Sequence, residues 1–347
     1  MGSLPAYKQT SILRIIWLCS LLTACASQSP MASTTPTAVW PAPPEATRIA
    51  YIQSFSKPED LGITKGFFTR AFEFIVGKSD LRLIRPMAVA VTADGAIYVT
   101  DPGSHGVQLF DKKQQIYRLI QRKDNLPLNS PIGLAVDSVG NVYVTDSGLG
   151  QVFVIKAGSK IAELVPLDTP IQQPTGIAFD PLGNRLYIVD TSGHQIRIVA
   201  PDGRQISTFG KRGNGNGEFN FPTMVWRDND GRLYVADSLN FRIQIFDSEG
   251  KFLGLFGRHG DSTGDLSHPK GITTDRDGHV YVLDSMHHAL QIFKRDGELL
   301  LSIGSRGRGP GEFWLPAGAF MTDDNYLYIA DSYNQRIQLL HYLGDKP

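Results

Sequence analysis

Cysteine is almost absent from this sequence of 347 residues. The two that occur, Cys19 and Cys25, lie at the N-terminus, so the rest of the chain has no thiol that could form a disulfide or bind a metal. Net charge is also missing, because 34 Lys and Arg residues balance 34 Asp and Glu residues. Proteins that bind nucleic acid in bulk carry a basic excess, so this balance argues against nucleic acid as a partner.

Long apolar runs are lacking as well. The run at residues 15–22 is too short to span a bilayer as a helix, and it follows Lys8 and Arg14 in the charged-then-apolar order of a signal peptide. Residues 22–25 read Leu-Thr-Ala-Cys, which resembles the bacterial lipobox. The resemblance implies that residues 1–24 are a cleaved lipoprotein signal peptide and that Cys25 carries acyl chains such as palmitate. An ordinary secretory signal cut near Ala26, or an uncleaved anchor, is the alternative.

The segment after Cys25 predicts how the protein is held. Residues 25–46 are rich in Ser, Thr, Pro and Ala with almost no charge, which is typical of a flexible tether. Ala26 is not Asp, which by the sorting habit of Gram-negative bacteria predicts the outer membrane, facing the periplasm. The predicted location is therefore the cell envelope, with the membrane contacted through the lipid anchor.

The rest of the chain repeats one unit six times. Each copy has a short β-rich run that ends in Asp, and the successive aspartates are 44 to 47 residues apart. The six runs are residues 97–101, 142–146, 186–190, 233–237, 280–284 and 327–331. A Pro opens an apolar strand before each run, and turn pairs such as Asp94-Gly95 join the two strands as hairpins.

A third and a fourth apolar strand follow the Asp, for example at residues 243–246 and 252–256. Four strands per unit predict an all-β, six-bladed β-propeller over residues 47–347, because radial stacking lets each sheet cover the apolar face of the next. The last unit stops after its third strand, so the strand at residues 48–55 is predicted to supply the fourth and close the ring. Residues 58–77 alone show a helical spacing of apolar residues and predict one short helical insertion.

Two units carry a recognisable motif. Residues 213–222 read Gly-Asn-Gly-Asn-Gly-Glu-Phe-Asn-Phe-Pro, and residues 235–244 read Val-Ala-Asp-Ser-Leu-Asn-Phe-Arg-Ile-Gln. Residues 307–316 and 329–338 repeat this pattern, and together these segments resemble the NHL repeat. NHL propellers are mostly binding platforms for protein or RNA, and a minority are enzymes such as the peptidyl-hydroxyglycine amidating lyase.

Arginines recur on the loops of these units. Arg242 and Arg336 lie five residues after a repeat Asp and are expected to pair with a carboxylate, while the repeat aspartates themselves are expected to accept backbone N–H groups. Cationic, Gly-flanked loops precede the last three blades and could attract an acidic partner, or could simply be solvated turns. The candidate ligand-face residues are Arg212, Arg242, Arg258, Arg306, Arg308 and Arg336.

Histidines break the repeat. His105, His194 and His288 each lie four residues after the repeat Asp, in the first, third and fifth units. In a closed ring they would be related by a near-threefold axis, and three converging imidazoles would resemble an open Zn²⁺ site. The competing interpretation is that they are ordinary residues of exposed loops.

The leading prediction is a non-catalytic envelope lipoprotein that binds a protein or glycan partner and needs no cofactor. Export makes RNA an unlikely ligand. The alternative is a periplasmic lyase or hydrolase that resembles the NHL-type amidating lyases and uses a divalent metal such as zinc, held by His105, His194 and His288. No catalytic residue can be assigned.

Overall fold

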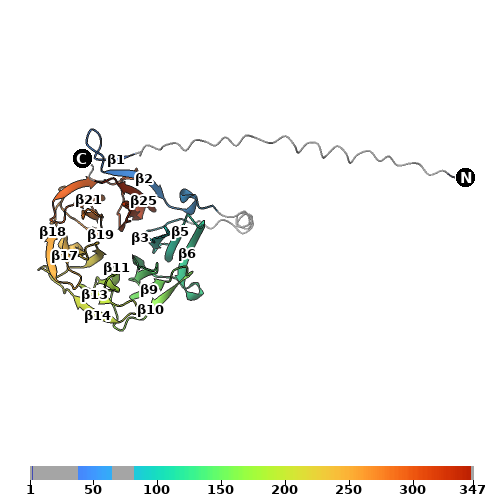
Figure 1. Ribbon diagram of the computed structural model, residues 1–347, viewed down its shortest axis with the longest axis horizontal. Helices are drawn as coiled ribbons and strands as arrows, with labels where there is room; N and C mark the ends of the chain where they lie inside the picture. The colour runs from blue at the N-terminus through green and yellow to red at the C-terminus, as the bar shows by residue number, and fades with distance from the viewer. Residues whose placement is uncertain (1, 3–37, 65–81, 345–347) are drawn as a thin grey trace. The chain divides into compact units, whose positions relative to one another are not determined.

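The computed structural model describes residue 2 and residues 38–64 and 82–344. From residue 38 onward the strands form a ring of six blades, each an antiparallel sheet of four strands, as Figure 1 shows. The predicted all-β, six-bladed propeller is therefore confirmed. In each blade the first strand lies nearest the centre of the ring and the fourth lies at its rim.

The repeat unit maps directly onto the blades. The strands of the first three blades are β3 (Ala88–Val91), β4 (Ile97–Asp101), β5 (Gly106–Asp111) and β6 (Ile116–Arg122); β7 (Pro131–Val136), β8 (Val142–Asp146), β9 (Gln151–Ile155) and β10 (Ile161–Val165); β11 (Pro174–Asp180), β12 (Arg185–Asp190), β13 (Gln195–Val199) and β14 (Gln205–Phe209). Those of the fourth and fifth blades are β15 (Pro222–Arg227), β16 (Leu233–Asp237), β17 (Arg242–Phe246) and β18 (Phe252–Phe256); β19 (Pro269–Thr274), β20 (Val280–Asp284), β21 (Ala289–Phe293) and β22 (Leu299–Ile303).

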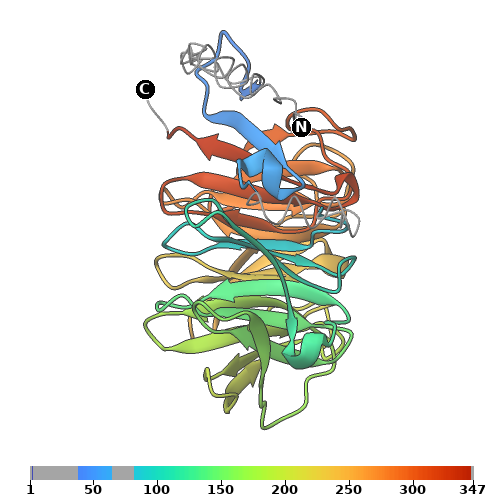
Figure 2. The same cartoon turned by 90° about the vertical axis from the view of Figure 1, so that its right-hand side faces the viewer.

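The sixth blade joins the two ends of the ring, as predicted. It consists of β23 (Ala319–Met321), β24 (Tyr326–Asp331), β25 (Arg336–Tyr342) and β2 (Ile49–Phe55). β2 pairs antiparallel with β25 from Ile49↔Tyr342 to Phe55↔Ile337, and Figure 2 shows this blue strand against the red ones. Ile49 and Phe55 are buried, so the closing strand also contributes to the core.

Two features differ from the expectations. β1 (Val39–Trp40) pairs with β2 inside the stretch predicted to be tether, because the Trp40 side chain packs on the core of the sixth blade. The outer strands β6 and β10 pair in parallel, which joins the first two blades into one eight-stranded sheet. An outer strand has unpaired backbone groups at its free edge, and here two such edges satisfy each other.

Of the predicted helical insertion, the described part is the single 3₁₀ turn Pro58–Leu61, and residues 65–81 lie outside the described chain. Three further 3₁₀ turns occur at Lys123–Asn125, Ser238–Asn240 and Ser332–Asn334. Within the described ranges, no helix is long and apolar enough to cross a membrane.

Glycines let the first strands crowd together around the axis. A Cβ on Gly133 would lie 2.3 Å from the carbonyl oxygen of Thr175, and one on Gly176 would lie 2.5 Å from Cα of Met224. Gly271 and Gly318 occupy the equivalent positions and would also meet the backbone of the next blade. A side chain at these positions would push neighbouring blades apart.

Candidate functional site

The six repeat aspartates organise one face of the ring. Oδ1 of Asp101 accepts the backbone N–H of Arg85 and that of Gly103, both at 2.9 Å, so it joins the segment entering its blade to the loop leaving its second strand. The prediction that these carboxylates hold backbone N–H groups is confirmed. We call this side the aspartate face and the side with the turns between first and second strands the hairpin face. The six repeat aspartates, all of them fully buried, are Asp101, Asp146, Asp190, Asp237, Asp284 and Asp331.

Arg242 and Arg336 extend this scaffold. Nε of Arg242 donates to Oδ2 of Asp237 at 2.7 Å, and its terminal nitrogens donate to three backbone carbonyls of the loop 211–221. Arg336 bonds in the same way to Asp331 and to the loop 304–315. Every nitrogen of both guanidinium groups therefore donates within the protein, and these two candidates position loops on the aspartate face.

The other four arginines are exposed on the loops before the fourth, fifth and sixth blades. Nε of Arg258 donates to Asp265 at 2.6 Å, and the guanidinium of Arg306 lies 5.2 Å from the ring centre of Trp314. Arg212 and Arg308 have no ion pair among the described residues. The structure thus brings four predicted cations to one side of the ring.

Exposed apolar side chains lie on the same face. Leu239, Met286 and Tyr333 each lie two residues after a repeat aspartate and are 40%, 59% and 51% exposed. The ring of Tyr333 lies 5.7 Å from that of Trp314, which also carries Arg306. We use the name sixth-blade patch for Arg306, Arg308, Trp314 and Tyr333.

The three histidines occupy equivalent turn positions with left-handed φ angles of 56°, 52° and 53°. Nδ1 of each ring bonds to the segment that leads into the next blade, and its partner is the carbonyl of Leu128 for His105, the N–H of Phe221 for His194 and the N–H of Leu315 for His288. Across the described ranges, none of the three belongs to a group whose metal-ligand atoms lie within 4.8 Å of one another. The structure therefore places the three imidazoles at separate junctions between blades.

The group of possible ligands that does lie together in the described chain is on the hairpin face. It consists of Asp275, Asp277 and His279. Nδ1 of His279 lies 2.8 Å from Oδ2 of Asp275, and the Tyr342 hydroxyl donates to Asp277 at 3.0 Å. These bonds tie the turn before β20 to β25, so the group has a structural role.

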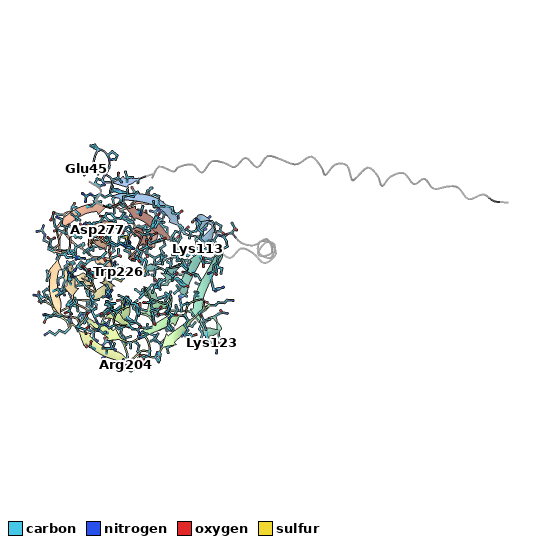
Figure 3. The ribbon with its side chains drawn as sticks, in the orientation of Figure 1. Glu45, Lys113, Lys123, Arg204, Trp226 and Asp277 are labelled. Carbon is cyan, nitrogen blue, oxygen red and sulfur yellow. The ribbon has the colours of Figure 1, made fainter. Side chains whose placement is uncertain are left out.

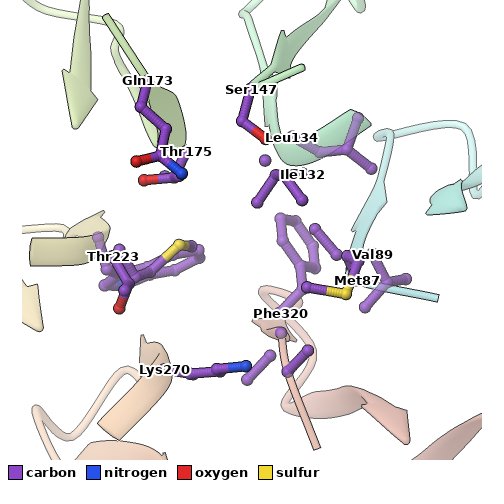
Figure 4. A pocket seen from close by; sticks show the side chains of 18 residues that line it. Met87, Val89, Ile132, Leu134, Ser147, Gln173, Thr175, Thr223, Lys270 and Phe320 are labelled. Atoms are coloured by element: carbon purple, nitrogen blue, oxygen red, sulfur yellow. The ribbon is translucent and has the colours of Figure 1, made fainter. Parts of the chain in front are cut away.

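A cavity of about 200 Å³ lies on the axis of the ring (Figure 4). The first strands of all six blades line it, together with the residues just before them. Trp226 and Phe320 meet edge to face across it, with ring centres 5.8 Å apart. Figure 3 shows Trp226 toward the middle of the ring, whereas Arg204 lies at its rim.

The residue after each repeat Pro lines this cavity, and in the second to fifth blades a β-bulge follows that Pro. In the fifth blade Pro269 pairs with Asp284 and Gly271 with Leu283, which leaves Lys270 as the extra residue. Thr223 is the extra residue of the fourth blade. A bulge turns its extra side chain away from the regular direction of the strand. The six residues of this ring are Met87, Ile132, Thr175, Thr223, Lys270 and Ala317.

Lys270 is the one charged side chain that lines the cavity, and its ammonium group points into it (Figure 4). Burial lowers the pKa of Lys270, and the positive charge of Arg85 lowers it further. Burial likewise lowers the pKa of His268, with Lys270 as the second cause. No described carboxylate pairs with Lys270.

Sequence reasoning missed this lysine. A signal exists in the sequence, in the residue that follows each repeat Pro of the six units. At this position Lys270 is charged and the residues of the other five units are neutral.

Comparisons with known proteins support the fold. A family model described as a 6-bladed beta-propeller matches residues 272–342, which cover most of the last two blades. No curated protein sequence matches the chain.

Solved structures give the same result. Virginiamycin B lyase from Staphylococcus aureus is similar at 15% identity and a TM-score of 0.55, covering 75% of this chain and 95% of that one. An auxiliary nutrient binding protein from Bacteroides thetaiotaomicron is similar at 12% identity and a TM-score of 0.60, covering 76% and 71%. A nidogen/laminin complex contains a chain similar at 20% identity and a TM-score of 0.53, covering 67% and 83%. At these identities the likeness shows a shared propeller fold.

Proposed function

We propose that this propeller is a non-catalytic binding protein of the cell envelope, held at the membrane by acyl chains on Cys25, and that its aspartate face binds a protein or glycan partner. One observation carries the proposal: the sixth-blade patch places two exposed arginines beside the rings of Trp314 and Tyr333, and the repeat scaffold fixes the loop that carries the arginines. The propeller neighbours include a protein complex and a nutrient-binding protein, which supports a binding role in general.

The chemistry of the patch suits a partner with acidic groups. Arginine presents a planar fork of donors that fits a carboxylate, and Trp, Tyr and Arg are the residues that most often dominate binding energy. Arg336 bonds to the carbonyls of Arg308, Gly309 and Glu312, so the loop loses little freedom when it binds.

The exposed aliphatic groups favour a protein over a glycan. Leu239 and Met286 stand on the neighbouring blades of the same face and offer no hydrogen bond to a sugar. A protein surface with apolar residues inside an acidic rim would cover both kinds of group.

Photocrosslinking in the native envelope tests the proposal. A benzophenone amino acid at Tyr333 is expected to trap a discrete partner, and the substitutions Arg306→Glu and Arg308→Glu together are expected to abolish the adduct. The same probe at Leu182, an 87% exposed residue of the hairpin face, is the control for position. Lys251→Glu, which reverses an exposed charge on the hairpin face, is the control for charge. Equal adducts from both probe positions, or none from Tyr333, would contradict the proposal.

The metal-dependent lyase or hydrolase has a separate test. A stoichiometric transition metal in the purified protein, lost when His105, His194 and His288 are replaced by Ala, would support that alternative. A metal-free protein would contradict it. The bonds of these rings to neighbouring blades favour a structural role.

A further inference from the structure

We infer that the axial cavity is a second binding site, for a small monocarboxylate whose apolar part is about the size of a phenyl ring. The site is separate from the loop surface proposed above and does not depend on it. Three features support it: the size of the cavity, the aromatic rings at its inner end and the position of Lys270.

Size limits the ligand to a small molecule. Cavities of roughly 150 Å³ lined by apolar groups hold benzene. The axial cavity, at about 200 Å³, leaves room for such a ring and one additional polar group. A polymer strand or a nucleotide would not fit.

Two aromatic rings line the inner end of the cavity. In the strand register, Trp226 lies opposite Tyr234 and Phe320 lies opposite Tyr328. Both tyrosines lie three residues before the repeat Asp of their blade. The other four blades have Ala or Thr in the place of Trp226 and Phe320. At about 3.3 Å per residue this level is roughly 10 Å deeper than the ring that contains Lys270. The indole N–H of Trp226 donates to the hydroxyl of Thr274 at 2.9 Å, which fixes the ring. An apolar group entering from the aspartate face therefore meets these two aromatic rings, which lie edge to face.

The entrance carries the charge. Lys270 extends into the cavity (Figure 4), and the other five residues of its ring are uncharged. Lys270 is half-buried, a partly desolvated cation without a counterion is unfavourable, and no described carboxylate supplies one. A ligand that places a single negative charge beside Lys270 would remove this cost.

The composition of the cavity selects the class of anion. One ammonium group balances one charge, so a monoanion fits better than a dianion such as phosphate. The side-chain amide of Gln173, which also lines the cavity, can meet the second carboxylate oxygen. The blade does not need a charge at this position in order to fold, because the other five blades have neutral residues there.

Titration calorimetry on the mature protein tests the inference. The probes are benzoate, phenylacetate and 4-methylpentanoate, with benzyl alcohol and inorganic phosphate as comparisons. We expect at least one carboxylate to saturate one site and to bind more tightly than benzyl alcohol or phosphate. The change Lys270→Met, which keeps the length of the side chain, is expected to weaken binding about 10- to 100-fold, the usual range for losing a charged hydrogen bond.

Lys251→Met, an exposed lysine on the hairpin face, is the matched control and should leave the affinity unchanged. Thermal unfolding of both variants shows whether the fold is intact. If Lys270→Met fails to fold, the two single variants Lys270→Arg and Trp226→Ala are titrated instead, because each changes the same cavity. Absence of saturation by all three carboxylates at millimolar concentration would overturn the inference. So would binding that is equally tight for benzyl alcohol or unchanged in Lys270→Met.

Discussion

Lys270 shows how one residue can give a repeated fold a distinct site. The backbone around it recurs in the second and third blades: the repeat Asp284 holds the N–H of His268, and the bulge after Pro269 turns the next side chain to the axis. Because the backbone fixes the direction of the side chain, the residue type at this position can differ from blade to blade. A cation at this position faces solvent, neighbouring cations and apolar walls together.

The pKa of Lys270 should respond to Arg85. Burial is the first cause of its lowered pKa and the charge of Arg85 the second, so removing that like charge makes the ammonium form easier to keep. Arg85→Gln is therefore expected to raise the pKa of Lys270 toward its usual value without restoring it fully. NMR titration of ¹³C-methylated lysines, with the signal assigned by Lys270→Arg, measures the change. Arg204→Gln at the rim is the control, and an unchanged pKa in Arg85→Gln would show that the two groups do not interact.

At the scale of strands, the arrangement of each blade could be predicted and the contacts between blades could not. The alternation of apolar residues and the hairpin turns predict β15 and β16, for example, from local sequence alone. The parallel pairing of β6 with β10 depends on where two free edges meet in space, which no local pattern records. The β-bulge at Lys270 could not be predicted from local sequence either, because it is a shift in the register between two strands and no residue type marks it.

The glycines of the first strands set how closely the blades approach. Gly176 has no left-handed φ, so the objection to a side chain there is steric: the added Cβ would lie 2.5 Å from Cα of Met224. Gly176→Ala is expected to lower the free energy of unfolding by about 1–3 kcal/mol, the usual cost of overpacking. Gly254→Ala on the outer strand β18 is the matched control, since nothing lies within 4 Å of its new Cβ. Urea unfolding followed by circular dichroism compares them, and equal midpoints would contradict the steric argument.

The whole molecule is proposed to combine an anchored N-terminus with a rigid ring. A ring holds its loops in fixed positions while the sequences of those loops vary, which suits a binding surface. Residues 22–25, which are predicted to be a lipobox, and the loops of the aspartate face lie far apart in sequence, so anchoring and binding can be tested independently.

Anchoring should depend on Cys25. Cys25→Ala removes the thiol that would carry the acyl chains, so the protein is expected to move from the membrane fraction to the soluble fraction and to lose palmitate incorporation. Cys19→Ala, in the predicted signal peptide, should change neither. Continued palmitate labelling of Cys25→Ala would contradict the lipoprotein prediction.

Closure of the ring should depend on β2. Ile49 and Phe55 are 1% exposed in the sheet that β2 forms with β25, and burying each contributes about 1.5–3 kcal/mol. A chain that begins at residue 56 is therefore expected to lose about 3–6 kcal/mol of stability relative to one that begins at residue 38, because the sixth blade then has an open edge and an uncovered apolar face. Urea unfolding of the two chains measures the difference. A synthetic peptide of residues 47–57 should restore part of it by pairing with β25, whereas a peptide with Ile49 and Phe55 both changed to Asp should not. Equal stability of the two chains would mean that the ring holds together through its other contacts between blades.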